Sequence, residues 1–119
     1  MKYTIKDIPP RNNKYLGKGS KGLRYKYQDD KRLWEWLVRQ AVGRNKPKKP
    51  LSRAKVRLIY YFETRHRRDP DNYSGKFILD GLVKAKVIED DSFKCIDLEL
   101  VGKYDKDNPR TEIKVKEVE

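Results

Sequence analysis

The 119-residue chain contains a single cysteine, Cys95, and a single histidine, His66. One cysteine cannot form an intrachain disulfide, and one cysteine with one histidine cannot build a structural zinc site. Long hydrophobic runs are also missing. No stretch approaches the roughly 20 apolar residues of a membrane span, and the first residues lack the apolar core of a signal peptide. We therefore expect a cytoplasmic protein without a membrane partner.

Acidic residues are in the minority: 30 Lys and Arg residues face 18 Asp and Glu residues, which gives a formal net charge of +12. The basic residues are distributed over the whole chain rather than gathered in a tail. Such an excess favours a polyanionic partner, above all nucleic acid. With 11% aromatic residues the chain is expected to fold, as one domain over residues 1–119. A core this small also favours a homodimer, because dimerisation buries more surface.

Hydrophobic periodicity predicts an α+β fold. Alternating apolar and polar residues indicate strands, whereas apolar residues spaced three and four apart, as from Leu33 to Ala41, indicate a helix. Two helices and a small mixed sheet of about four strands are expected, in the order β-α-β-α-β-β. The predicted elements are a strand at 2–7, a basic Gly-rich loop at 11–28, a helix capped by Asp29 or Asp30 and ending near Arg44, a strand at 54–63, a helix at 73–85, a strand beginning at Ile96, and a last strand with Ile113 and Val115 that pairs back as a hairpin.

Two glycine-containing segments imitate nucleotide-binding motifs. Residues 17–22 match G-x-G-x-x-G, but they lack the buried strand before and the helix after that this motif requires. Ser74-Gly75-Lys76 resembles the end of a P-loop, but Phe77 stands where the metal-binding hydroxyl belongs. No nucleotide cofactor is therefore expected. The first segment is better explained as a basic loop over a phosphate backbone, with Lys18, Lys21 and Arg24 as candidate phosphate contacts.

A third match imitates the PD…ExK pattern of restriction-like nucleases, with Pro70-Asp71 followed by Glu112-Ile113-Lys114. In a chain this rich in Glu and Lys an E-x-K match is expected by chance, and the wide spacing also argues against it. His66 stands among arginines and has no zinc-ligand partner, so it is interpreted as a surface or phosphate contact. The neighbouring candidates for phosphate contacts are Arg65, Arg67 and Arg68.

Carboxylates gather in two pairs within this basic chain. Asp69 and Asp71 flank Pro70, and Asp90 and Asp91 follow the second predicted helix. Pro70 biases Asp69 towards an extended conformation, and a strand–helix–strand path can return the second pair to the side of the first. Crowded carboxylates repel one another unless a cation neutralises them. Oxygen ligands select a hard ion, which predicts Mg²⁺, with Mn²⁺ as a possible substitute.

A divalent ion held by carboxylates on a basic surface is the apparatus of phosphodiester hydrolysis. Lys76, at the start of the second predicted helix, is placed to offset the charge that develops on the phosphate. The alternative interpretation is that the acidic residues are only helix caps and surface ion pairs. The chain would then be a non-catalytic DNA- or RNA-binding module. A less selective metal-dependent nuclease is a further alternative.

The ordered motifs of the chain resemble those of the RusA-type Holliday junction resolvases, which are small endonucleases of phages and prophages. The resemblance spans almost the whole chain. One departure is that three residues, 73–75, separate the motif's Asn72 from Lys76, where family members commonly have two. The segments that carry the resemblance are Pro9–Tyr15, Asp69–Asn72, Lys76, Asp80–Leu82 and Asp90–Asp91.

The resemblance implies a homodimer that cleaves four-way DNA junctions with Mg²⁺ by paired symmetric nicks, in a bacterial or phage-infected cell. It implies that Asp69, Asp71 and Asp91 bind the metal and that Lys76 is catalytic, and it leaves open whether Glu89 or Asp90 joins the ligands. The expected products carry a 5′-phosphate and a 3′-hydroxyl. The DNA contacts expected over the chain are Asn13, Lys14, Lys18, Lys21, Arg24, Arg65, Arg67 and Arg68.

Overall fold

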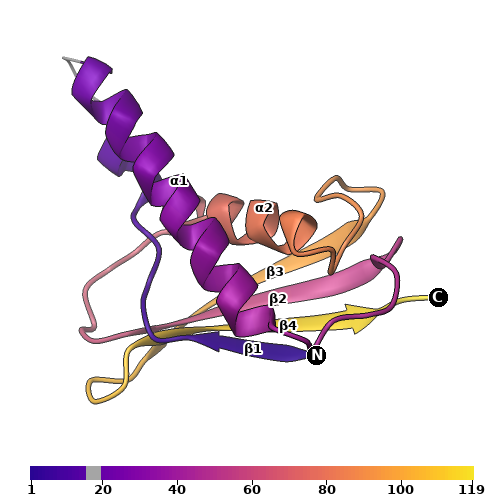
Figure 1. Cartoon of the computed structure of the whole chain (residues 1–119). Coiled ribbons are helices and arrows are strands. Elements are labelled where there is room, and N and C mark those ends of the chain that lie inside the picture. The colour runs from indigo at the N-terminus through magenta and orange to yellow at the C-terminus, as the bar shows by residue number, and fades with distance from the viewer. Residues whose placement is uncertain (16–19) are drawn as a thin grey trace.

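A mixed sheet forms one layer of the molecule, and two helices cover one of its faces (Figure 1). The computed structural model of the chain describes residues 1–15 and 20–119. The α+β prediction and its element order are confirmed. Within the described ranges, no helix combines the length and the hydrophobicity needed to cross a membrane. The elements are β1 (Lys2–Ile5), η1 (Asn12–Tyr15), α1 (Ser20–Val42), β2 (Ala54–Phe62), η2 (Pro70–Tyr73), α2 (Lys76–Lys84), β3 (Ile96–Tyr104) and β4 (Arg110–Glu117), where η denotes a 3-10 helix.

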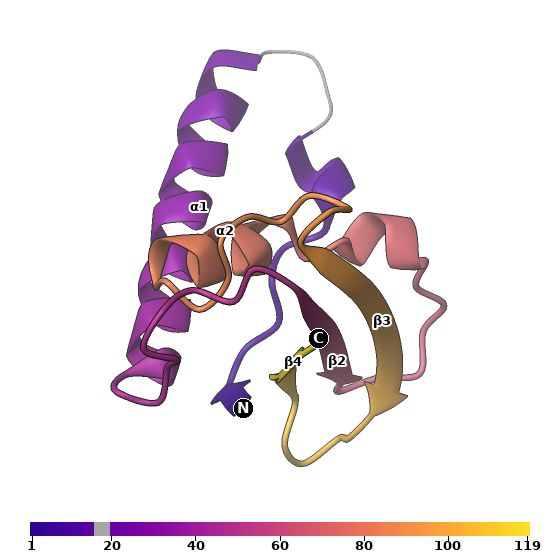
Figure 2. The same ribbon diagram turned by 90° about the vertical axis from the view of Figure 1, so that its right-hand side faces the viewer.

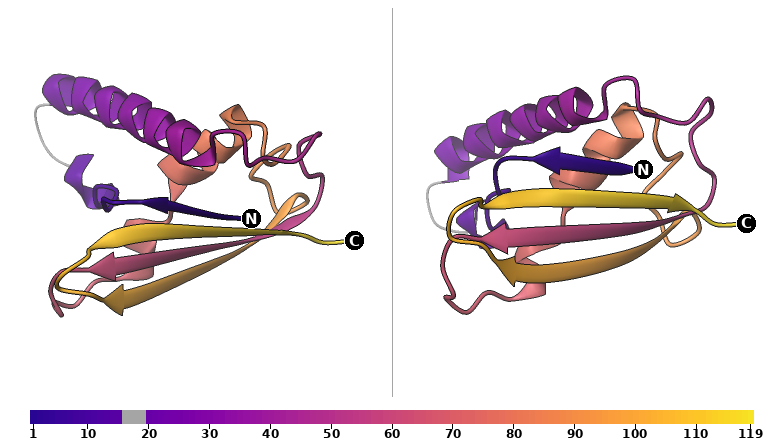
Figure 3. Two further views of the ribbon diagram at one scale, coloured as in Figure 1. Left: turned by 60° about the horizontal axis from the view of Figure 1, so that its bottom comes forward. Right: turned by 90° about the horizontal axis from the view of Figure 1, so that it is seen from below.

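The four strands lie in the order β1-β4-β2-β3. Strand β2 runs parallel to β3 and antiparallel to β4, and β4 also pairs antiparallel with β1. Because parallel neighbours need a crossover connection, the chain leaves the sheet after β2, passes through η2 and α2, and returns to start β3. Figure 3 shows the strands side by side below the two helices.

The core lies between the sheet and the two helices. Trp34, Val38 and Val42, spaced four residues apart on α1, are buried, which is the apolar stripe expected of an amphipathic helix. Helix α2 crosses α1 where Gly81 meets Val38, and a Cβ atom added at Gly81 would lie 2.8 Å from the Val38 Cβ. The absence of a side chain at Gly81 therefore allows the two helices to approach closely.

Two predicted features of the N-terminal half are wrong. The stretch 11–28 was expected to be a loop, but it contains η1, and α1 already begins at Ser20. Asp29 and Asp30 were the candidate caps, but both lie inside α1. Asp30 is buried and accepts hydrogen bonds from Tyr15 Oη at 2.7 Å and Lys14 Nζ at 3.1 Å. Burial acts to raise the pKa of Asp30, but these two hydrogen bonds hold it below its usual value. The side-chain contacts around Tyr15 stabilise the extra helical turns, and this long-range packing is not visible in local periodicity.

The predicted hairpin between the last two strands is also wrong. Strand β4 crosses to the far side of β2, and β3 is left at the edge of the sheet. The burial pattern follows this order: Thr111, Ile113 and Val115 of β4 are almost completely buried, whereas most of β3 is exposed. Strand β4 pairs on both sides, with β1 and with β2, whereas β3 pairs only with β2.

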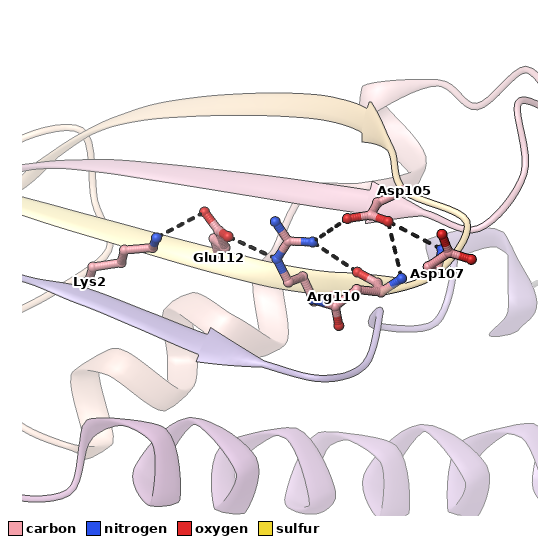
Figure 4. A network of polar contacts seen from close by, with 6 residues as sticks. Lys2, Asp105, Asp107, Arg110 and Glu112 are labelled. Carbon is pink, nitrogen blue, oxygen red and sulfur yellow. Dashed lines mark hydrogen bonds and ion pairs between the residues drawn. The ribbon is translucent and has the colours of Figure 1, made fainter.

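A polar network closes the turn between β3 and β4 (Figure 4). Arg110 donates to Asp105 at 2.8 Å and to Glu112 at 2.9 Å, and its guanidinium lies over the Tyr61 ring at 3.7 Å. The hydrogen bond from Arg110 holds the pKa of Asp105 below its usual value. Burial acts to raise the pKa of Glu112, but the hydrogen bond from Arg110 lowers it. Both Arg110 and Lys2 pair with the Glu112 carboxylate, so it is not free to bind a metal ion. This supports the rejection of the PD…ExK match.

Candidate active site

The first aspartate pair lies on the segment that connects β2 to α2. Residues 69–73, which comprise Asp69 and η2, are called the aspartate segment below. Asp69 has extended backbone angles, with φ −101° and ψ 136°, as expected for a residue before proline. Asp71 lies within η2, so it is not extended. Both side chains are exposed. Asp69 forms a 3.4 Å ion pair with Arg67, which at an exposed position contributes little to stability.

The N-terminal segment holds η2 in place. Asn12 Nδ2 donates to the Asp71 carbonyl at 2.8 Å and to Ser74 Oγ at 3.0 Å. The backbone N–H of Asn13 donates to Asn72 Oδ1 at 3.0 Å. The side chain of Asn13 is exposed, and its role as a DNA contact stays a prediction. The contact of Asn12 with η2 was not predicted. The Asn12-Asn13 pair in the N-terminal segment was the only signal in the sequence that could have indicated it.

Helix α2 begins directly after the aspartate segment. Gly75 stands at its N-cap with a left-handed φ of 79°, a conformation that glycine adopts without strain. A Cβ atom added there would lie 2.2 Å from Leu58 Cδ1 and 3.2 Å from Tyr60 Oη. Gly75 thus allows a tight turn between η2 and α2. Lys76 follows as the exposed first residue of the helix, and its catalytic role stays a prediction.

The structure does not bring Asp91 to the side of Asp69 and Asp71. The backbone N–H groups of Cys95 and Ile96 both donate to the Ser92 carbonyl at 3.0 Å, so Asp91 is next to the start of β3. Asp69 instead lines a hollow with Leu100 and the two residues that follow it on β3. Ile96 and Leu100 are four residues apart, or about 13 Å along a strand.

The crossover explains this separation. A βαβ connection leaves one end of the sheet and returns to the other, so residues after β2 and residues before β3 lie at opposite ends of α2. Figure 2 shows the chain passing from β2 through α2 to the start of β3. In the part of the chain that the structure describes, no three His, Cys, Asp or Glu side chains are grouped so that they could hold one metal ion. The carboxylates are the right ligands for Mg²⁺, but one chain does not assemble the three predicted ones.

Several predicted DNA contacts have partners within the protein. Lys14 pairs with Asp30, the Arg65 guanidinium lies 4.5 Å from the centre of the Tyr104 ring, and Arg68 lies 4.2 Å from that of Phe62. Arg68 also donates to the Thr64 hydroxyl at 2.7 Å. Arg67 is the freest of the arginines here, with 90% of its side chain exposed.

The other predicted contacts are on or before α1. Arg24 is exposed on this helix, whose N-terminal half projects beyond the sheet (Figure 1). Lys18 and the side chain of Lys21 lie outside the described residues.

A basic groove of about 660 Å³ runs past the aspartate segment. Lys6 and Arg11 line it together with Lys14 and Arg68, and neither Lys6 nor Arg11 was predicted as a contact. Phe62 and Tyr73 give the groove an apolar part, and Asp7 and Glu63 are its acidic members. Basic and aromatic residues together suit the backbone and bases of a nucleic acid strand.

An exposed aspartate turn beside a basic groove, on a chain of net charge +12, suits a protein that binds a polyanion such as nucleic acid. The comparison with protein families specifies this class. The model of the family described as "Endodeoxyribonuclease RusA" matches residues 7–116, and the chain belongs to this family. Family membership implies endodeoxyribonuclease activity of the Holliday junction resolvase kind, directed at branched DNA. No curated protein gives a significant match to the chain.

Proposed function

We propose that this protein is an Mg²⁺-dependent endonuclease that resolves four-way DNA junctions by paired symmetric nicks, in a bacterial or phage-infected cell. The whole chain acts as one domain and works as a homodimer. The observation that supports this best is the clamp of η1 on η2, which presents Asp69 and Asp71 to solvent beside the basic groove. The cuts leave a 5′-phosphate and a 3′-hydroxyl.

The chain's own residues bind and orient the substrate. Lys6 and Arg11 hold backbone phosphates in the groove, and Arg67 adds an exposed positive charge next to Asp69. Lys76 offsets negative charge on the phosphate under attack. The chemistry that Mg²⁺ supplies when bound, with Mn²⁺ as a substitute, is Lewis-acid activation of the phosphoryl group and of water. Asp69 and Asp71 are the proposed ligands from the aspartate segment.

We propose that the homodimer supplies the third carboxylate. A two-fold axis can bring the Asp91 loop of one chain to the Asp69 and Asp71 of the other, and the same contact then forms twice. Phe93, two residues beyond Asp91, is 100% exposed. An exposed aromatic ring beside the Asp91 loop suits such a contact, since phenylalanine is enriched in protein interfaces.

Mixing two inactive variants tests this shared site. In a mixed dimer of Asp71→Asn and Asp91→Asn chains, one site carries both substitutions and the other carries neither. We therefore expect the mixture to nick a junction although each variant alone is inactive. If each site lay within one chain, both sites of the mixed dimer would be damaged and the mixture would stay inactive. Gel filtration of the two variants checks that they are dimers.

The substrate preference tests the function itself. Purified protein is incubated with a labelled four-way junction or with a linear duplex of the same arm sequence, in Mg²⁺ or in EDTA. We expect nicks in the junction in Mg²⁺, far fewer in the duplex, and none in EDTA. Equal cleavage of both substrates would identify a less selective nuclease. Binding without any cleavage would identify a non-catalytic module.

Salt dependence tests the groove. Each phosphate contact adds about 0.9 to the slope of log binding constant against log salt concentration. We expect the Lys6→Ala and Arg11→Ala variants each to lower that slope by about one for junction binding, measured by fluorescence anisotropy in EDTA. Lys116→Ala, an exposed site on β4 outside the groove, is the control and should keep the full slope. Unchanged slopes in both groove variants would remove Lys6 and Arg11 from the interface.

A further inference from the structure

An aromatic cavity of about 270 Å³ lies where the N-terminal segment, α1 and the start of α2 meet. Apart from Lys76 on its wall, the proposed chemistry does not use this cavity. The cavity is mostly apolar, with few polar groups on its wall. Its lining includes Pro10, Asn12, Tyr15, Tyr27, Lys76 and Phe77.

Three rings of this wall support one another. Tyr15 and Tyr27 meet edge to face, with ring centres 5.0 Å apart, and Tyr27 meets Phe77 in the same way at 5.2 Å. The hydroxyl of Tyr15 is fixed by its hydrogen bond to Asp30. Aromatic side chains held in this way form a rigid surface, so the cavity is preformed for a flat apolar ligand.

The cavity is continuous with the candidate active site. It shares Pro9, Pro10 and Tyr73 with the basic groove. Ser74, Gly75 and Lys76 form part of its wall, and they follow the aspartate segment directly. Asn12 also lines the cavity, and it donates to the Asp71 carbonyl.

We propose that this cavity, called the base pocket below, binds one unstacked nucleobase of the DNA strand whose phosphate is cleaved. The inference rests on the proposed function, because it takes the strand in the basic groove to be the substrate. A nucleotide has a charged phosphate and a flat aromatic base. The groove provides positive charge, and the adjoining base pocket provides aromatic walls.

We assign a nucleobase as the ligand because the aromatic pocket adjoins a groove that suits phosphates. A base at a branch point can leave the stack at lower cost than one inside a continuous duplex, since the helix is interrupted there. Stacking on aromatic side chains binds a base of any identity. Asn12 and Ser74 add a few hydrogen-bonding groups to the wall, and such groups can discriminate between bases. The base pocket is thus also the proposed origin of any base preference at the cut.

A coupling experiment between base and pocket tests the proposal. A single abasic nucleotide is moved through the positions around the branch point of a labelled junction, and binding is measured by anisotropy in EDTA. For the wild-type protein we expect one position per cleaved strand at which loss of the base weakens binding about tenfold. The Tyr27→Leu variant, which removes the ring, should bind the intact and the abasic junction at that position equally.

Two further variants separate the ring's contact from its effect on folding. Tyr27→Phe keeps the ring and should retain the tenfold difference. Tyr25→Leu lies on the same helix, but its side chain is 72% exposed and does not line the pocket, so it should also retain the difference. Thermal unfolding shows which variants are folded, and if Tyr27→Leu is not, Phe77→Leu takes its place.

The outcomes are distinguishable from those of the nuclease test, because this assay requires binding and not cleavage. A base-dependent position that disappears only when the ring is lost supports the base pocket, even for a protein that does not cut. Absence of any such position, or a difference that persists in both leucine variants of the pocket, overturns it, even for a protein that cuts junctions efficiently.

Discussion

Replacing Asp71 by asparagine is expected to lower junction cleavage at least about 100-fold while junction binding stays equal or becomes tighter. Asparagine has the same shape but lacks the negative charge that a metal ligand provides. The fold of η2 should be preserved, because Asp71 contacts Asn12 through its backbone carbonyl and not through its side chain. Removing a carboxylate also removes repulsion from the DNA phosphates. Single-turnover cleavage and anisotropy on the same junction measure both effects.

The matched control is Asp107→Asn. Asp107 is also an exposed aspartate, but it lies in the turn between β3 and β4, where its backbone N–H contacts Asp105. This variant should cleave like the wild-type protein. Full cleavage by Asp71→Asn would remove this carboxylate from the active site, and equal losses in both variants would point to a general effect of charge.

Replacing Gly75 by alanine is expected to lower the free energy of unfolding by about 2–4 kcal/mol. The left-handed φ of 79° is strained for alanine, and the new Cβ would overlap Leu58, a core residue of β2. Relief of that overlap must move the turn between the aspartate segment and Lys76. We therefore expect cleavage to fall by more than the loss of folded protein explains. Urea unfolding and cleavage rates at equal folded concentration measure the two effects.

The Gly43→Ala variant separates the cost of the left-handed backbone from the cost of a steric overlap. Gly43 also has a left-handed φ, of 52°, but a Cβ atom there would meet only the Gln40 carbonyl oxygen at 3.8 Å. This variant should lose about 1 kcal/mol and keep its cleavage rate. Equal destabilisation by the two alanines would show that the Leu58 contact at Gly75 carries no cost.

Local pattern was enough to predict most of the fold. Apolar and polar residues alternate along β2, and Trp34 and Val38 form an apolar stripe on α1. Each pattern shows which face of a single element is buried, and it can be read from residues that are close together in the sequence. The start of α1 could not be predicted in this way. It depends on packing between Tyr27 and Phe77, whose rings meet although the residues lie on different helices. The position of β4 depends likewise on pairing with strands far away in the chain, since β4 lies between β1 and β2.

The candidate site was predicted in part. The motif order identified Asp69, Asp71 and the neighbouring Lys76 as one segment, because they follow one another closely in the chain. The placement of Asp91 was not predictable from spacing, since a helix of suitable length is compatible with either end of the sheet. The role of Asn12 required the contact with η2 to be seen. The basic groove was also missed, because Lys6 and Arg11 do not stand out in a chain with 30 basic residues.

A supercoiled plasmid with an extruded cruciform tests the central claim most directly. Two symmetric nicks across the four-way junction within one binding event convert the plasmid to a linear form, whereas single nicks give an open circle. The account predicts a linear product with Mg²⁺ that appears without accumulation of open circle and is absent with the Asp71→Asn variant. A plasmid that stays supercoiled, or that yields only open circles, would contradict it.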